Sequence, residues 1–182
     1  MIEYFIHKRW LLAFWLTFGV ACDPDSEAPP DAAVDAGTDA GLDGGERDPR
    51  FIPVFPEDFE ASYIEMRDCR HSHEHELRYI RVLASPTARE PYAALTPEVP
   101  YPVGATLVKL EYDDEGCETV VGYTAMRKQP EGTVPAGKDW MWQKLTVDRE
   151  VTEGGAPRVC IDCHREHCAP PNGYDLSCAE EL

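Results

Sequence analysis

The sequence lacks any apolar run long enough to cross a membrane as a helix. Its longest apolar run, residues 10–20, follows Lys8 and Arg9 and is shorter than the roughly 20 residues that a membrane-spanning helix needs. A basic segment followed by a short apolar one is typical of a secretory signal peptide. We therefore predict that residues 1–21 are an export signal that is removed from the mature protein.

Positive charge is also scarce, since 17 Lys and Arg face 34 Asp and Glu and the formal net charge is −17. A protein that binds nucleic acid normally presents a basic surface to the phosphates. The composition therefore argues against nucleic acid as a partner.

Large apolar residues are nearly missing from residues 23–50, which are rich in Asp, Ala, Gly and Pro. Such a segment buries too little apolar surface to offset the entropy of ordering it. Just before it, Gly19-Val20-Ala21-Cys22 resembles a bacterial lipobox, although Gly19 stands where the box usually carries Leu and ordinary signal peptidase would also accept these small residues. We predict that Cys22 is lipidated and that residues 22–50 form a disordered acidic tether. The tether would hold a domain, residues 51–182, off the lipid bilayer, in the periplasm or at the outer face of a bacterial membrane.

The domain contains several runs of β-branched and aromatic residues separated by loops rich in Gly and Pro. These runs are residues 77–83, 106–112, 118–126 and 140–147, and we predict long loops at residues 127–139 and 148–159. Phe59, Tyr63 and Met66 fall at helical spacing, and Ser85-Pro86 is typical of a helix start. We predict a mainly β (α+β) fold, an antiparallel sheet with a few short helices.

Near the C-terminus, Cys160-Ile161-Asp162-Cys163-His164 has the Cys-x-x-Cys-His pattern of c-type haem attachment. The two thiols can each form a thioether with one haem vinyl group, and the histidine that follows can bind the iron axially. An export signal strengthens this interpretation, because haem is attached covalently outside the bacterial cytoplasm. We predict one covalent haem c on Cys160 and Cys163, with His164 as the axial ligand of the iron.

Two alternatives stay open for the same motif. A thiol redox pair would be expected in a βαβ context, whereas this motif follows a loop rich in Gly and Pro. A zinc site would draw on the surrounding cluster of ligand types, although an oxidising compartment tends to pair spare thiols as disulfides. That cluster is Cys160, Cys163, His164, His167 and Cys168.

The cysteine count supports both lipidation and disulfides. The sequence has seven cysteines, so removing the haem pair leaves an odd number, and removing Cys22 as well leaves Cys69, Cys117, Cys168 and Cys178. Four cysteines permit three pairings. Proximity along the chain favours disulfides Cys69–Cys117 and Cys168–Cys178.

Several short blocks, taken in order, resemble the cytochrome P-460 family, which includes cytochrome c prime beta. The blocks are Cys69-Arg70 with His73, Tyr79-Ile80-Arg81-Val82, Tyr101-Pro102-Val103-Gly104-Ala105-Thr106-Leu107-Val108-Lys109, Met126-Arg127-Lys128, Gly137-Lys138-Asp139-Trp140-Met141-Trp142 and the haem motif. The resemblance covers most of residues 59–164 and implies a mainly antiparallel β fold with helices. Residues 165–182 depart from the family.

The resemblance implies a five-coordinate haem with His164 as the proximal ligand and an open distal face for a small diatomic or nitrogenous ligand. Family members either oxidise hydroxylamine, using a lysine cross-linked to the haem, or bind nitric oxide without that bond. Lys109 is the candidate for the cross-link. On its strand, however, Lys109 shares a face with Leu107 and Glu111, which is the usual pattern of a half-solvated lysine.

The alternative function is a mono-haem electron-transfer cytochrome, which would need a sixth protein ligand and a redox partner protein. The candidate ligands are Met126, Met141, His71, His73 and His75. The methionines are also suited to the core, and the histidines to a polar strand entry or helix cap. Trp140 and Trp142 alternate onto one face, which predicts core packing, with packing against the haem edge as a variant.

Overall fold

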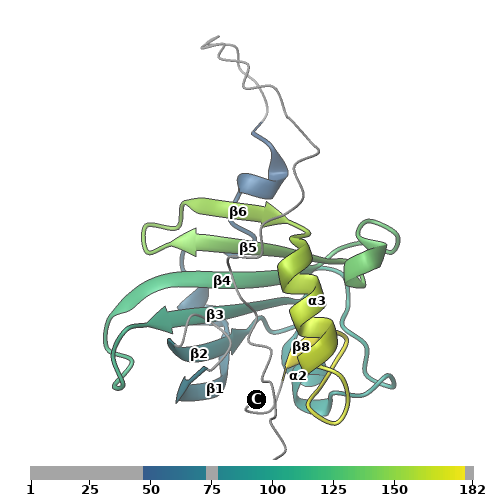
Figure 1. Cartoon of the computed structure of the whole chain (residues 1–182), viewed down its shortest axis with the longest axis horizontal. Coiled ribbons are helices and arrows are strands. Elements are labelled where there is room, and N and C mark those ends of the chain that lie inside the picture. The colour runs from purple at the N-terminus through teal and green to yellow at the C-terminus, as the bar shows by residue number, and fades with distance from the viewer. Residues whose placement is uncertain (1–46, 73–77, 179–182) are drawn as a thin grey trace, which may run out of the picture.

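The computed structural model describes residues 47–72 and 78–178, and its main feature is one antiparallel sheet in which neighbouring strands follow each other along the chain (Figure 1). The strands are β1 (Ile64–His71), β2 (Tyr79–Ala84), β3 (Thr106–Tyr112), β4 (Val120–Lys128), β5 (Trp140–Thr146) and β6 (Val151–Gly155), and a separate small hairpin is formed by β7 (Gly173–Tyr174) and β8 (Ser177–Cys178). The helices are α1 (Phe59–Ser62), α2 (Arg89–Ala94) and α3 (Arg158–His167), with 3-10 turns η1 (Pro49–Phe51) and η2 (Pro135–Gly137). This confirms the predicted mainly β fold with a few short helices.

Both faces of the sheet are covered, and each has its own apolar cluster. We call one of them the α3 face, because Ile161 of α3 packs there. Its strand residues are Ile80, Val82, Ala84, Leu107, Met126, Trp140 and Trp142. The other face, which we call the α1 face, packs against α1 and the segment before it. Its cluster combines Val54, Phe55 and Phe59 of that covering layer with the strand residues Leu83, Val108, Leu110, Tyr112, Tyr123, Ala125, Leu145 and Val151. Alternate residues of a strand point to opposite faces, so β2, β3, β4 and β5 each contribute to both clusters.

The helix expected from Phe59, Tyr63 and Met66 is much shorter than that spacing predicts. Helix α1 ends at Ser62, and Met66 lies in β1, which pairs with β2 from Ile64↔Ala84 onward. A single turn of helix has little stability of its own, so the pairing with β2 decides the conformation of this segment. The prediction of one helix through Met66 was therefore wrong.

The second helix also starts later than expected. Helix α2 begins at Arg89 and its N-cap residue is Ala88. Ser85 instead accepts a hydrogen bond from the Thr106 backbone N–H on its side-chain oxygen, at 3.0 Å. Ser85 therefore joins the end of β2 to the start of β3 rather than capping α2.

Strand β6 lies within residues 148–159, which the sequence pattern assigns to a loop. A side chain at Gly154 would overlap the Arg50 carbonyl, so glycine permits the close approach of η1 to this edge strand. Residues 47–50 lie within the described part of the chain, so the folded domain starts slightly before residue 51. Within the described residues no helix is long and apolar enough to cross a membrane. The predicted signal peptide, Cys22 and most of the predicted tether lie outside those residues.

Candidate functional site

Helix α3 carries the Cys-x-x-Cys-His motif, and neither of its two cysteines is in a disulfide. Cys160 and Cys163 are both partly exposed, and residues three apart lie on neighbouring positions of one helical face. Every other cysteine in residues 47–72 and 78–178 is in a disulfide. The two motif cysteines are thus set apart from the disulfide-bonded ones.

The thiol chemistry of Cys160 does not favour a redox pair. Burial, and after it the charge of Glu153, raises the pKa of the Cys160 thiol to about 11. Catalytic Cys-x-x-Cys pairs work through a thiol with a lowered pKa, because the thiolate is the nucleophile. A protonated, half-buried thiol is suited to one permanent covalent bond rather than to repeated redox cycles.

His164 is arranged as a metal-binding histidine. Its Nδ1 lies 2.6 Å from the Leu176 carbonyl oxygen, and since a carbonyl can only accept, Nδ1 carries the proton and Nε2 carries the lone pair. Burial, and after it the nearby charge of Lys109, lowers the pKa of His164 to about 4. The ring is therefore neutral at physiological pH, which is the form that binds iron. Ligating histidines usually donate their other N–H in this way.

Lys109 lies beside the motif. Its charge interacts with Cys160 and Cys163 and contributes to the lowered pKa of His164. Lys109 itself is partly exposed, as expected of a half-solvated lysine, although Leu107 and Glu111 on either side of it are both buried. Burial also lowers the pKa of Lys109 to about 8. The structure therefore brings the candidate cross-linking lysine together with the haem motif.

Trp140 and Trp142 both lie in the core of the α3 face, as expected, with 0% and 6% of their surfaces exposed. The Trp142 ring meets the His164 ring edge to face, with centroids 6.3 Å apart. Its indole Nε1 is buried without a hydrogen-bond partner, whereas Trp140 Nε1 donates to the Asp175 carbonyl at 2.7 Å. An unsatisfied buried donor is rare.

The candidate sixth ligands are separated by the sheet. Met126 is buried on the α3 face, while Met141 packs against the cluster of the α1 face. An iron bound to His164 on the α3 face cannot be reached by Met141 through the sheet. His71 is exposed at the end of β1, where its ring contacts Tyr79, and His73 and His75 lie outside the described residues.

The ligand cluster expected for zinc is only partly assembled. Among the described residues, potential ligand atoms of His164, Cys168 and Cys178 lie within 4.8 Å of one another. Cys168 and Cys178 form a disulfide, and zinc binds thiolates rather than disulfide sulfurs. This grouping would thus bind zinc only after reduction.

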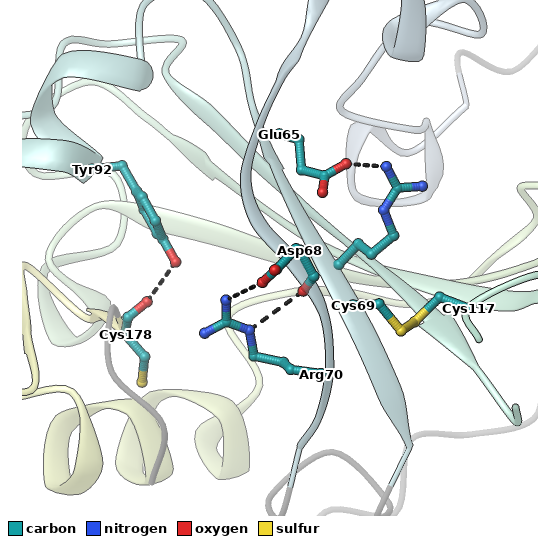
Figure 2. A network of polar contacts seen from close by, with 8 residues as sticks. Glu65, Asp68, Cys69, Arg70, Tyr92, Cys117 and Cys178 are labelled. Atoms are coloured by element: carbon teal, nitrogen blue, oxygen red, sulfur yellow. Dashed lines mark hydrogen bonds and ion pairs between the residues drawn. A yellow bond between two sulfur atoms is a disulfide. The ribbon is translucent and has the colours of Figure 1, made fainter. Parts of the chain in front are cut away.

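Two disulfides join the pairs that sequence proximity favoured. Cys69 of β1 is bonded to Cys117 in the turn before β4, with Cα atoms 5.8 Å apart (Figure 2). Cys168, just after α3, is bonded to Cys178 of β8, with Cα atoms 4.6 Å apart. The second bond connects the end of the haem-motif helix to the C-terminal hairpin.

We expect peptide mapping without reduction to recover these two linked peptides. Substituting serine for both cysteines of one pair should lower the free energy of unfolding by about 2–4 kcal/mol, because the bond restricts the unfolded chain. Denaturant unfolding of each double variant measures this. A peptide joining Cys69 to Cys168 or to Cys178 would contradict the pairing.

Comparisons of the chain with protein-family models, curated proteins and solved structures gave no significant match.

Proposed function

We propose that this chain is an exported, lipid-anchored protein that carries one covalent haem c and binds or transforms a small nitrogen species at its iron. The observation that carries the proposal is the state of helix α3. It holds two cysteines that are in no disulfide, Cys160 and Cys163, next to a histidine whose Nδ1–H is engaged by the Leu176 carbonyl. This combination is what covalent haem attachment with an axial histidine requires.

The residues around the motif fit a haem. Cys160 and Cys163 would bond the two vinyl groups, and His164 Nε2 would bind the iron. The iron would supply a site for a diatomic or nitrogenous ligand and for electron exchange. Trp142, with its unsatisfied Nε1, adds an aromatic surface beside His164, which supports the expectation that it packs near the haem.

Lys109 separates two versions of this function. The resemblance to the cytochrome P-460 family links a haem-bonded lysine to hydroxylamine oxidation, and its absence to nitric oxide binding. A pKa of about 8 gives the Lys109 amine a larger neutral, nucleophilic fraction than an ordinary lysine has. Intact mass decides between them, because a bonded Lys109 would give a loss of hydrogen relative to the two-thioether adduct. The mass of a Lys109→Arg variant, which cannot form the bond, is the matched reference.

Electron transfer is the alternative, and the position of Met126 on the same face as His164 favours keeping it. Chemistry at the iron needs an open coordination position, whereas an electron-transfer haem has two protein ligands. A redox partner protein would then replace the small ligand as the physiological partner.

We expect the reduced protein, produced in a host competent in haem attachment, to show a five-coordinate high-spin spectrum that changes on adding carbon monoxide. The physical reason is that His164 is the proposed sole protein ligand. A low-spin ferrous spectrum that ignores carbon monoxide would contradict this expectation. In that case Met126→Leu should convert the spectrum to high spin, while Met141→Leu, on the opposite face, should leave it unchanged.

A further inference from the structure

Each residue of the segment Asp175–Cys178 forms a hydrogen bond or an ion pair with a different part of the fold. The Asp175 carboxylate pairs with Lys128 Nζ at 2.6 Å, and its carbonyl accepts the Trp140 Nε1–H bond. The Ser177 hydroxyl shares a hydrogen bond with the Tyr101 hydroxyl at 2.8 Å. The Cys178 carbonyl accepts from the Tyr92 hydroxyl of α2 at 2.8 Å, as Figure 2 shows.

The remaining residue of this segment, Leu176, faces His164. Its carbonyl oxygen is the acceptor for the His164 Nδ1–H. Leu176 and Ser177 are only 4% and 1% exposed, so water does not compete for these bonds. The segment therefore offers one buried acceptor to the histidine and uses its neighbours to hold that acceptor in place.

The backbone of this segment makes the turn of the small hairpin, in which Tyr174 pairs with Ser177. Asp175 and Leu176 between them have φ angles of 51° and 66°, as the central residues of a two-residue hairpin turn require. Neither is a glycine, and residues with a Cβ seldom occupy this region. The bonds from Lys128, Trp140 and Tyr101 flank these two residues and keep the Leu176 carbonyl turned toward α3.

A covalent bond ties the same segment to the helix that carries the histidine. The disulfide Cys168–Cys178 joins the residue after α3 to the last residue of β8. In Figure 1, α2, α3 and β8 gather at the same end of the sheet.

We propose that Asp175–Cys178 is a clamp that positions His164, with Tyr92, Tyr101 and Trp140 as positioning residues acting through the Leu176 carbonyl. The inference rests on the proposed function, because it concerns how His164 serves the iron. A hydrogen bond from Nδ1–H to a carbonyl raises the basicity of the ligating nitrogen and fixes the orientation of the ring. A more basic ligand stabilises ferric over ferrous iron, so the clamp keeps the reduction potential low.

The test uses the full haem-loaded protein with Tyr92→Phe and Tyr101→Phe combined. Each substitution removes one hydroxyl that holds the clamp and keeps the aromatic ring in the core. We expect solvent exchange of the His164 Nδ1 proton, followed by NMR, to become about tenfold faster, the factor that one weakened hydrogen bond gives. We also expect the reduction potential to shift in the positive direction. Tyr123→Phe, in the cluster of the α1 face, is the matched control and should change neither.

A second pair of variants removes the covalent tie. Cys168→Ser/Cys178→Ser should shift exchange and potential in the same directions, whereas Cys69→Ser/Cys117→Ser removes a disulfide that is not part of the clamp and should not. Normal haem staining with an unmoved potential and exchange rate in the tyrosine and Cys168/Cys178 variants would overturn the clamp while leaving the proposed function intact. An unsubstituted protein without haem would overturn both.

Discussion

Cys160→Ala/Cys163→Ala should abolish covalent haem in the mature protein. Each thioether needs one of these thiols, so neither thioether can form in the double variant. Denaturing electrophoresis followed by haem-peroxidase staining should show a stained band for the unsubstituted protein and none for the double variant. Each single variant should retain a weaker band through its remaining thioether.

The control for this experiment is a cysteine pair that lies outside α3. Cys69→Ser/Cys117→Ser removes two cysteines and a disulfide but leaves α3 unaltered, so its band should stay. The haem proposal would be contradicted if the natural protein, made in a host competent in haem attachment, stayed unstained and bound zinc stoichiometrically. The His164, Cys168 and Cys178 grouping would then be the first place to look for that zinc.

Trp140→Ala should lower the free energy of unfolding by about 3–5 kcal/mol, the usual cost of emptying a large buried aromatic site. Trp140 is fully buried, its ring packs edge to face on Tyr101 with centroids 5.0 Å apart, and Lys128 Nζ lies 5.1 Å from the ring centroid. The substitution also removes the N–H donor to Asp175. Denaturant unfolding at fixed redox conditions measures the change.

Two further variants serve as controls for this prediction. Val103→Ala trims an apolar residue that is 63% exposed and should change stability by no more than about 0.5 kcal/mol. Trp140→Phe keeps most of the buried ring and loses the donor, so its cost should fall between the two. A loss of less than about 1 kcal/mol for Trp140→Ala would show that the core of the α3 face collapses around the gap.

The sequence alone determined the features that depend on local pattern and on cysteine chemistry. The β-rich run at residues 106–112 coincides with β3, because alternation of β-branched and apolar residues with period 2 needs no knowledge of partners. The two disulfide pairs were also predicted correctly, because proximity along the chain favoured these pairings among the three that four cysteines permit. The Cys-x-x-Cys-His motif is local by nature, and its chemistry follows from its spacing.

Other elements were decided only by tertiary pairing. Phe59, Tyr63 and Met66 have helical spacing, but pairing between β1 and β2 placed Met66 in a strand. A single helical turn is weak without packing. The sequence pattern did not predict strand β6, because its glycines are typical of a loop. The strand contains glycine because η1 approaches it closely. Which methionine shares the face of His164 depended on the register of β4 and β5.

The environment of His164 was the part least accessible to sequence reasoning. Lys109 reaches the motif from a distant strand, and neither residue type nor spacing along the chain predicts that approach. The acceptor that sets the His164 tautomer is the backbone carbonyl of Leu176, and a carbonyl belongs to every residue, so it has no signature in the sequence. Cys160, Cys163 and His164 are identified by their local order. Their surroundings come from strands and a hairpin that only the folded chain brings together.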